Sequence, residues 1–257
     1  MIDLKFLGTG GIGSVRPKNK LSRDYRRFAT ILINEAILLD PSEDIFEFES
    51  TFMLPGLTSG AKDVFITHSH IDRFSPLAIE KLALRGGVRV YAEKSLIPEI
   101  KELSGVEATP IEPFGLVRVG HHTVVALPAN HSTDIKGETA FNYLIESEGT
   151  TVLYALDGAW ISSDAFKVLK EAKLSAVIFD FGAALLPYGE ECSRHNNVEM
   201  VKNMVEMLEN CGVCTEKTKI FLSNVPTGRK RPTHEEMSEL IADYPYKLAY
   251  DGYFTVI

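Results

Sequence analysis

The segment Thr67–Arg73, with the sequence THSHIDR, contains the residue types that a catalytic metal needs. It follows the apolar run Val64–Ile66, which predicts a buried strand. His68 and His70 can direct two imidazoles at one ion from the end of that strand, and Asp72 can place a carboxylate beside it. These are the ligands of catalytic zinc when one position stays open for water. A lone His-x-His also occurs by chance in solvated loops, so the rest of the chain must decide.

Further polar residues follow apolar segments elsewhere in the chain. His131 comes soon after the apolar run 123–127, Asp157 follows the run 151–156, and His195 lies in a later loop. Active sites collect at strand ends in layered α/β folds, so these positions favour a shared site. Asp157 precedes a glycine, and a simple turn is the alternative for it.

Other histidines are expected to be structural or solvated. His121 and His122 follow a glycine in a polar turn, which predicts exposure to solvent. His234 is expected on the surface, in the first turn of a helix that Thr233 and Glu236 cap.

The glycines near the N-terminus have the G-x-G-x-x-G spacing of a nucleotide-binding turn, at Gly8, Gly10 and Gly13. No helix pattern follows them, so we reject that interpretation. We expect them instead to permit positive φ or a close backbone approach.

Size and composition are those of an ordinary globular enzyme. The chain has 257 residues, of which 45% are hydrophobic and 24% charged. It contains no apolar run long enough to span a membrane and no signal-peptide pattern, so a cytoplasmic location is expected. Three cysteines are too few for a disulfide framework.

The formal net charge of −8 disfavours extended contact with nucleic acid, whose binding depends on neutralised phosphates. One basic stretch, Arg16–Arg27, stands out against this charge. It is interpreted as a solvated loop or, alternatively, as an anchor for an anionic substrate.

The elements that would position these residues alternate hairpins with βα units. Helices are predicted at 76–84, 95–103, 163–172 and 198–208 and from about 233, and apolar runs predict strands at 4–7, 29–34, 36–39, 64–66, 88–91, 123–127, 141–145, 151–156, 176–180 and 219–222. This order predicts two facing sheets with helices outside, in one domain spanning 1–257.

The order of these motifs resembles the metallo-β-lactamase fold superfamily over essentially the whole chain. The resemblance is carried by Phe6–Gly11, Ile37–Asp40 and Thr67–Asp72, the last of these matching the H-x-H-x-D signature. His131 and Asp157 match its third histidine and its bridging aspartate. The resemblance implies an α/β fold, a four-layer αββα sandwich of two mixed β-sheets with helices on the outer faces.

A closer resemblance is to the phosphodiesterase branch that includes ribonuclease Z and the cyclic-phosphate phosphodiesterase of phosphonate degradation. Arg194–Met200 and Ala249–Gly252 are similar to segments of that branch. The resemblance implies that His195 donates a proton to the leaving oxygen.

Two positions depart from the family pattern. Arg73 stands where the signature continues with histidine, and Asn224 stands where the late metal-ligand histidine is expected. The resemblance implies that the two replaced histidines would bind a second metal, whereas the expected ligands of the first metal are present, namely His68, His70, His131 and Asp157. We therefore hypothesise one ion rather than two, with Arg73 supplying part of the second ion's charge. Zinc is the first expectation, and manganese or iron also fits, because two carboxylates suit harder ions.

These observations predict a metal-dependent hydrolase, most simply a phosphodiesterase acting through a metal-bound hydroxide on a small phosphate ester. Asp72 would orient the water or accept its proton, and Arg73 would clamp the anionic substrate. A lactone, thioester or carboxylic ester hydrolase is one alternative. A catalytically degenerate metal- or nucleotide-binding protein is another, and homo-oligomerisation is left open.

Overall fold

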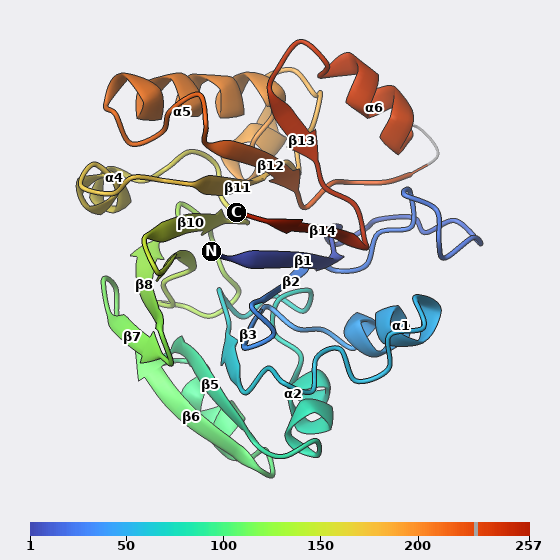
Figure 1. The fold of residues 1–257 in the computed structure, drawn as a ribbon, viewed down its shortest axis with the longest axis vertical. Helices are drawn as coiled ribbons and strands as arrows, with labels where there is room; N and C mark the ends of the chain where they lie inside the picture. The colour runs from blue at the N-terminus through green and yellow to red at the C-terminus, as the bar shows by residue number, and fades with distance from the viewer. Residues whose placement is uncertain (229–230) are drawn as a thin grey trace.

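Two β-sheets face each other and carry helices on their outer sides in this computed structural model, which describes residues 1–228 and 231–257 (Figure 1). Each sheet has seven strands within the described residues. The first has the order β14 (Tyr253–Val256), β1 (Asp3–Gly8), β2 (Thr30–Ile33), β3 (Ile37–Leu39), β4 (Asp63–Phe65), β5 (Val88–Glu93) and β6 (Val106–Ile111). The second has the order β13 (Tyr246–Leu248), β12 (Lys219–Ser223), β11 (Ala176–Asp180), β10 (Thr150–Ala155), β9 (Phe141–Ser147), β8 (His122–Pro128) and β7 (Leu116–Val119).

The helices complete the four layers that the sequence predicted. Helices α1 (Asp44–Thr51), α2 (Pro76–Ala83) and α3 (Ile97–Lys101) accompany the first sheet, and α4 (Ser163–Leu169), α5 (Val198–Asn210) and α6 (His234–Leu240) accompany the second. Figure 1 shows α5 and α6 above the second sheet, and α1 and α2 beside the first. Both sheets mix parallel and antiparallel pairs, so the expected αββα sandwich is confirmed.

The main core lies between the sheets. Aromatic rings join them: the centroids of Phe6 and Phe221 are 5.5 Å apart, and those of Phe65 and Tyr143 are 5.4 Å apart. All four rings are buried. Burial of large aromatic side chains dominates core energetics, so these contacts fix how the two sheets meet.

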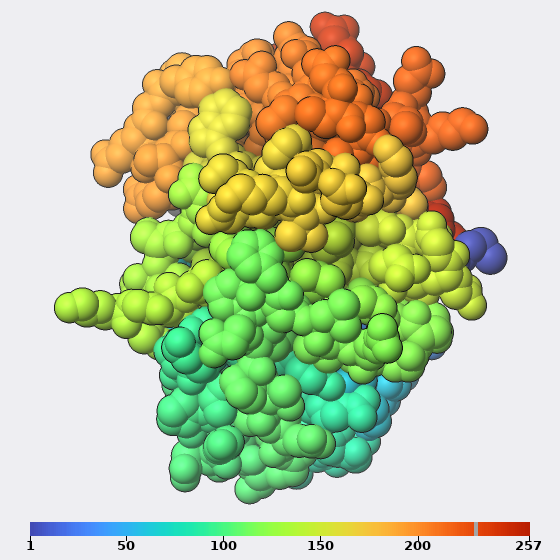
Figure 2. Space-filling model, turned by 90° about the vertical axis from the view of Figure 1, so that its left-hand side faces the viewer, coloured from blue at the N-terminus to red at the C-terminus, as the bar shows by residue number. Residues whose placement is uncertain are grey.

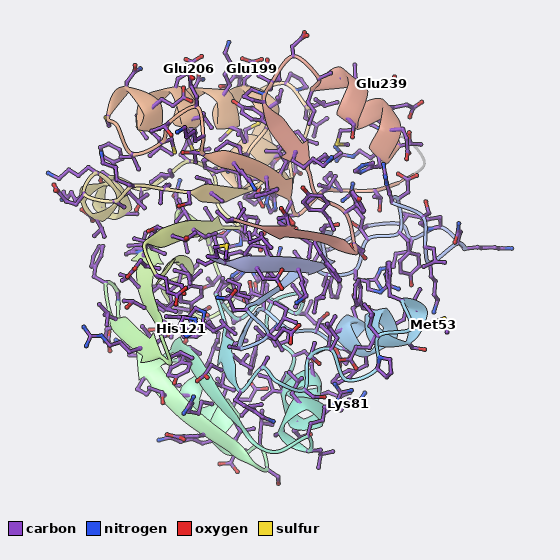
Figure 3. The ribbon with its side chains drawn as sticks, in the orientation of Figure 1. Met53, Lys81, His121, Glu199, Glu206 and Glu239 are labelled. Carbon is purple, nitrogen blue, oxygen red and sulfur yellow. The ribbon has the colours of Figure 1, made fainter. Side chains whose placement is uncertain are left out.

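Helix α5 shows how an outer layer attaches. Its apolar stripe is buried, and Met204 and Leu208 lie in the cluster under the helix. Glu199 and Glu206 project from its solvent face (Figure 3). Asn197 caps the helix by accepting a hydrogen bond from the backbone N–H of residue 200, which anchors the end of the loop that carries His195.

Figure 2 shows one side of the molecule, where the colours run from green in the lower half to yellow and orange in the upper half. Segments near β6 and β7 thus cover one part of this side, and segments near α4 and α5 cover the other.

Some elements were not predicted from the sequence, namely α1, β6, β7, β13 and β14. Strand β6 contains Pro110, which its edge position tolerates because a proline cannot donate to a further strand. None of the helices in the described ranges is both long and apolar enough to cross a bilayer.

The structure agrees that the N-terminal glycines do not form a nucleotide-binding turn, since the first element after Gly13 is strand β2 and not a helix. A Cβ on Gly8 would lie 1.9 Å from the carbonyl oxygen of Phe28, so this glycine permits a close backbone approach. Gly13 has a φ of +79°, as expected for a glycine in a turn.

Candidate metal centre and active site

Three imidazoles converge where the two sheets meet. Nε2 of His68 lies 2.8 Å from Nδ1 of His70, and Nε2 of His131 lies 3.3 Å from the same Nδ1 atom. One ring nitrogen from each residue lies within 4.8 Å of the other two. The structure therefore brings together the three histidines that the sequence singled out.

Each of these histidines follows a strand. His68 and His70 come after β4, where the backbone N–H of Phe141 donates to the carbonyl of Thr67 at 2.9 Å and so ties this loop to the start of β9. His131 follows β8. The His-x-His loop comes from the first sheet and His131 from the second, so packing of the two sheets assembles the cluster.

A chain of hydrogen bonds through Thr67 and Asp40 orients the ring of His68. The Thr67 hydroxyl lies 3.0 Å from both carboxylate oxygens of Asp40 and donates to this group. The hydroxyl is then an acceptor towards Nδ1 of His68, 3.0 Å away. With its proton on Nδ1, the ring presents the Nε2 lone pair to the other imidazoles, as a metal ligand must.

A second polar cluster, formed by Asp157, Asp180 and His195, lies beside the first. Nδ1 of His195 is 3.1 Å from Asp180 and 3.7 Å from Asp157. Burial alone would lower the pKa of His195, but the charge and hydrogen bond of Asp180 outweigh burial and raise the pKa to about 9. Asp180 therefore favours the protonated form of the His195 imidazole.

Asp180 was not predicted as a site residue, although it ends the buried strand β11 much as Asp157 follows β10. A carboxylate directly after an apolar run was the available signal. Asp157 lies outside the group of three histidines, and its two oxygens accept hydrogen bonds from Arg73 and from Asn224.

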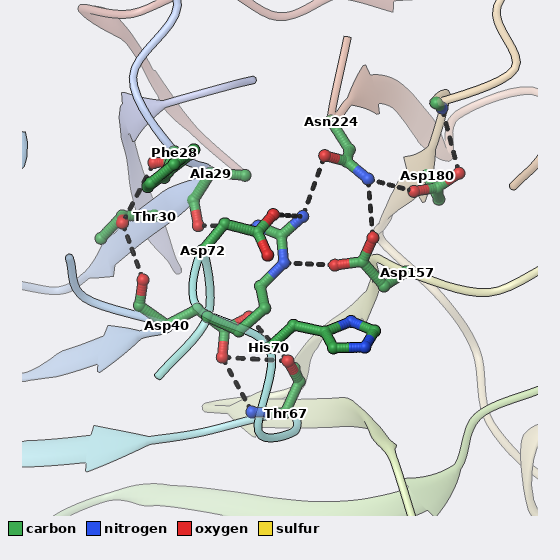
Figure 4. Close-up of polar contacts among 12 residues, drawn as sticks. Phe28, Ala29, Thr30, Asp40, Thr67, His70, Asp72, Asp157, Asp180 and Asn224 are labelled. Carbon is green, nitrogen blue, oxygen red and sulfur yellow. Dashed lines mark hydrogen bonds and ion pairs between the residues drawn. The ribbon is translucent and has the colours of Figure 1, made fainter. Parts of the chain in front are cut away.

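Arg73 lies deep in the site with no exposed surface. Its Nε donates to Asp157, its Nη2 donates to Asn224 Oδ1 at 2.9 Å, and Asp72 lies 3.4 Å from Nη2. Figure 4 shows Asn224 between Asp157 and Asp180, where its Nδ2 donates at 2.8 and 2.6 Å respectively. The expectation that Arg73 clamps the substrate is not supported by this geometry, because a fully buried guanidinium cannot reach a ligand in the pocket.

A pocket of about 430 Å³ lies beside these groups. His70, His131, Asp72 and His195 line it. Burial raises the pKa of the Asp72 carboxyl. At the same wall, a Cβ on Gly11 would come 2.3 Å from Oδ1 of Asn224, so only glycine leaves room for that amide.

The family model for beta-lactamase superfamily domains matches residues 35–221, which is most of the chain. The chain belongs to the beta-lactamase superfamily. No curated protein sequence matches this superfamily member. Its fold is nevertheless shared by many solved structures.

Three of these structures share the fold of this superfamily member over nearly their whole length. A diphosphatase from the PhnP family is 17% identical, with coverage of 100% of this chain and 98% of that one and a TM-score of 0.73. The metallo-beta-lactamase fold protein YhfI from Bacillus subtilis is 13% identical, with coverage of 99% and 98% and a TM-score of 0.71. The short form of human tRNase Z is 14% identical, with coverage of 99% of each chain and a TM-score of 0.65.

The metallo-β-lactamase fold implies a divalent metal ion, and the three-histidine cluster of this superfamily member fits one. Burial lowers the pKa of His68 and of His131, so both rings are neutral at neutral pH and have a lone pair to share. Nδ1 of His131 is buried and has no hydrogen-bond partner among the described residues. The close approach of three ring nitrogens is favourable when an ion lies between them.

The basic stretch Arg16–Arg27 is a solvated loop only in part: Lys18, Lys20 and Arg23 are exposed, whereas the other arginines have partners within the protein. Arg26 and Arg27 are buried. Arg26 donates to the carbonyl of residue 249 at 2.6 Å, and Arg27 forms an ion pair with Asp251 at 3.2 Å. Arg16, at the start of this stretch, also has a partner within the protein, because its Nη1 donates a hydrogen bond to Asp44. Both interpretations missed these partners because the aspartates lie far away in the sequence.

Two histidines expected at the surface are buried. His122 lies on β8, where its Nε2 is 2.8 Å from Asn34 Nδ2. His234 does begin a helix with the predicted capping box, but its ring packs inward with Nδ1 3.0 Å from Nη2 of Arg26. His121 is exposed, as expected (Figure 3).

Proposed function

We propose that this protein is a metal-dependent hydrolase that cleaves phosphodiesters, with a zinc ion held by His68, His70 and His131. The observation that carries the proposal is the convergence of these three imidazoles beside a pocket that His195 also lines, with its Nδ1 3.1 Å from Asp180. A set of nitrogen ligands and a proton donor in one pocket are the parts that hydrolysis of an ester requires.

A bound divalent ion would lower the pKa of a water molecule towards neutrality and so supply the nucleophile. Asp72 lines the same pocket, and its carboxylate accepts the proton of the attacking water. His195 has Nδ1 committed to Asp180, so Nε2 is the ring nitrogen left to donate a proton to the leaving oxygen. Asp180 keeps this imidazole charged and oriented.

Two observations support an anionic substrate. Arg194 and Arg231 line the pocket together with carboxylates such as Glu191, which lies 3.4 Å from Arg194, and a guanidinium there can bind a phosphate oxygen. Among the proteins of the same fold, one is described as a diphosphatase and another as a tRNase Z. A phosphate ester is therefore the substrate class that we propose.

Hydrolysis of bis(4-nitrophenyl) phosphate and of 4-nitrophenyl acetate, each with added Zn²⁺ or Mn²⁺, tests the proposal. We expect turnover of the phosphodiester, and loss of at least about 100-fold in His131→Ala, because this variant removes one of three ion ligands. His121→Ala, a matched change at an exposed histidine, should keep full activity. Turnover of the acetate alone would indicate a carboxylic ester hydrolase, and no turnover of either ester would indicate a binding protein.

A further inference from the structure

The guanidinium of Arg73 is surrounded by oxygen acceptors. Asp157 accepts from Nε, the carbonyl of Ala29 accepts from Nη1 at 3.2 Å, and Asn224 Oδ1 accepts from Nη2 at 2.9 Å. Asp72 adds a second carboxylate, 3.4 Å from Nη2. The arginine side chain is completely buried, so nearby carboxylates of the protein, Asp157 and Asp72 first among them, balance its charge.

The oxygen atoms around Arg73 form a cation site, and the cation that fills this site is the guanidinium group of the protein itself. Two carboxylates, an amide oxygen and a backbone carbonyl are the oxygen ligands that hard divalent ions take in proteins. Buried carboxylates need a compensating charge, and Arg73 provides it for Asp72 and Asp157. The second ion implied by the family signature does not fit here, because the guanidinium already fills the space between these oxygens.

The orientation of the Asn224 side-chain amide is the one expected beside the positive charge of Arg73. Its Oδ1 faces Arg73, while its Nδ2 donates to Asp157 at 2.8 Å and to Asp180 at 2.6 Å. Both amide hydrogens are thus used, and the amide oxygen, which is the only acceptor of this side chain, is bonded to Arg73. Asn224 also has a φ of +60°, a conformation that asparagine adopts more readily than most residues.

We propose that Arg73 and Asn224 form a built-in replacement for a second metal ion, so that the chain binds one divalent ion, and that changing both residues to histidine opens a second metal site. The inference rests on the proposed function only in placing the first ion at the three histidines. In the Arg73→His/Asn224→His variant, two imidazoles would join Asp72 and Asp157, which makes a four-ligand set for zinc.

The number of Zn²⁺ ions bound per folded chain, measured by native mass spectrometry and by elemental analysis after gel filtration, tests this inference. We expect one ion in the unsubstituted chain, one in Arg73→Lys, which keeps the internal charge, and two in the Arg73→His/Asn224→His variant. Two tightly bound ions in the unsubstituted chain would overturn the proposal whether or not the variants fold. A folded double variant that binds only one ion would overturn it as well.

The outcomes separate this inference from the proposed function. One bound Zn²⁺ without turnover of any ester would remove the hydrolase assignment and leave the role of Arg73 in place. Phosphodiester turnover by an unsubstituted chain that holds two ions would support the hydrolase assignment and overturn the proposed role of Arg73. A chain that binds no Zn²⁺ would overturn both, and loss of the single ion in His131→Ala is expected if both are correct.

Discussion

Gly182 lies against the imidazole of His195: a Cβ at residue 182 would come 2.6 Å from Cγ and 2.7 Å from Nδ1 of that ring. A side chain at this position must therefore displace the ring from Asp180. We expect Gly182→Ala to reduce turnover by roughly 100-fold, because small displacements of a catalytic group have effects of that size. Gly189→Ala is the control, since its Cβ would meet nothing closer than 3.8 Å. Equal activity of both variants would argue against a role for His195 in the reaction.

The proposed proton donation by His195 predicts a dependence on the leaving group. We expect His195→Gln to slow hydrolysis of an alkyl phosphodiester by about 100- to 10,000-fold, the range for general acid catalysis. Hydrolysis of a 4-nitrophenyl ester should fall much less, because nitrophenolate leaves without a proton. Steady-state rates with the two substrates measure the difference, and Asp180→Asn should show the same selectivity in weaker form. A uniform loss for both substrates would instead point to a positioning role.

Metal removal should lower the stability of the fold. A ligand that binds only the folded state stabilises it by about 2.7 kcal/mol when its concentration is 100 times its dissociation constant. We therefore expect a chelator to lower the melting temperature of the zinc-loaded protein, and Zn²⁺ to restore it. His131→Ala should melt at a temperature that Zn²⁺ does not change, whereas His121→Ala should respond like the unsubstituted chain. A zinc response in His131→Ala would contradict the assigned ligand set.

Stability should also fall in mild acid through His234. Burial and the nearby Arg26 lower its pKa from 6.5 to about 4 in the folded chain. The unfolded chain then binds a proton first as the pH falls, so stability is full above pH 6.5 and is lost between about pH 6.5 and pH 4. This histidine alone should cost about 2 kcal/mol between pH 7 and pH 5.

Urea unfolding at these two pH values measures the loss due to His234. The His234→Gln variant keeps an acceptor for Arg26 but does not titrate, so its stability should change less between the two values. A pH dependence identical to that of the unsubstituted chain would show that the buried ring is not responsible.

The layers of the fold could be predicted because apolar runs mark most strands of both sheets. The hairpin of β2 and β3 and the helices α2, α4 and α5 followed from local pattern and turn residues. Helix α1 was missed because no side chain caps its N-terminus and its sequence, DIFEFEST, alternates like a strand. Short edge strands such as β7 carry too few residues for a pattern.

The site was only partly predictable for a different reason. His68, His70 and His131 follow apolar strands, and local sequence shows that directly. The placement of Arg73 depends on Asn224 and Asp157, which lie 151 and 84 residues away. The sequence could indicate that a positive charge lies in the site. It could not indicate that the N–H groups of Arg73 are hydrogen-bonded to other residues of the protein. The buried positions of Arg26 and His234 depend in the same way on a contact 208 residues apart.

The pairing of β1 with β14 has a consequence for how the chain reaches its native state. Asp3 pairs with Val256, so the earliest strand of the first sheet finds its outer neighbour only near the far end of the chain. Until that segment leaves the ribosome, one edge of β1 has unsatisfied backbone groups that can recruit a foreign strand. Such distant pairing makes folding slow, so this edge is open to aggregation for as long as β14 is not in place.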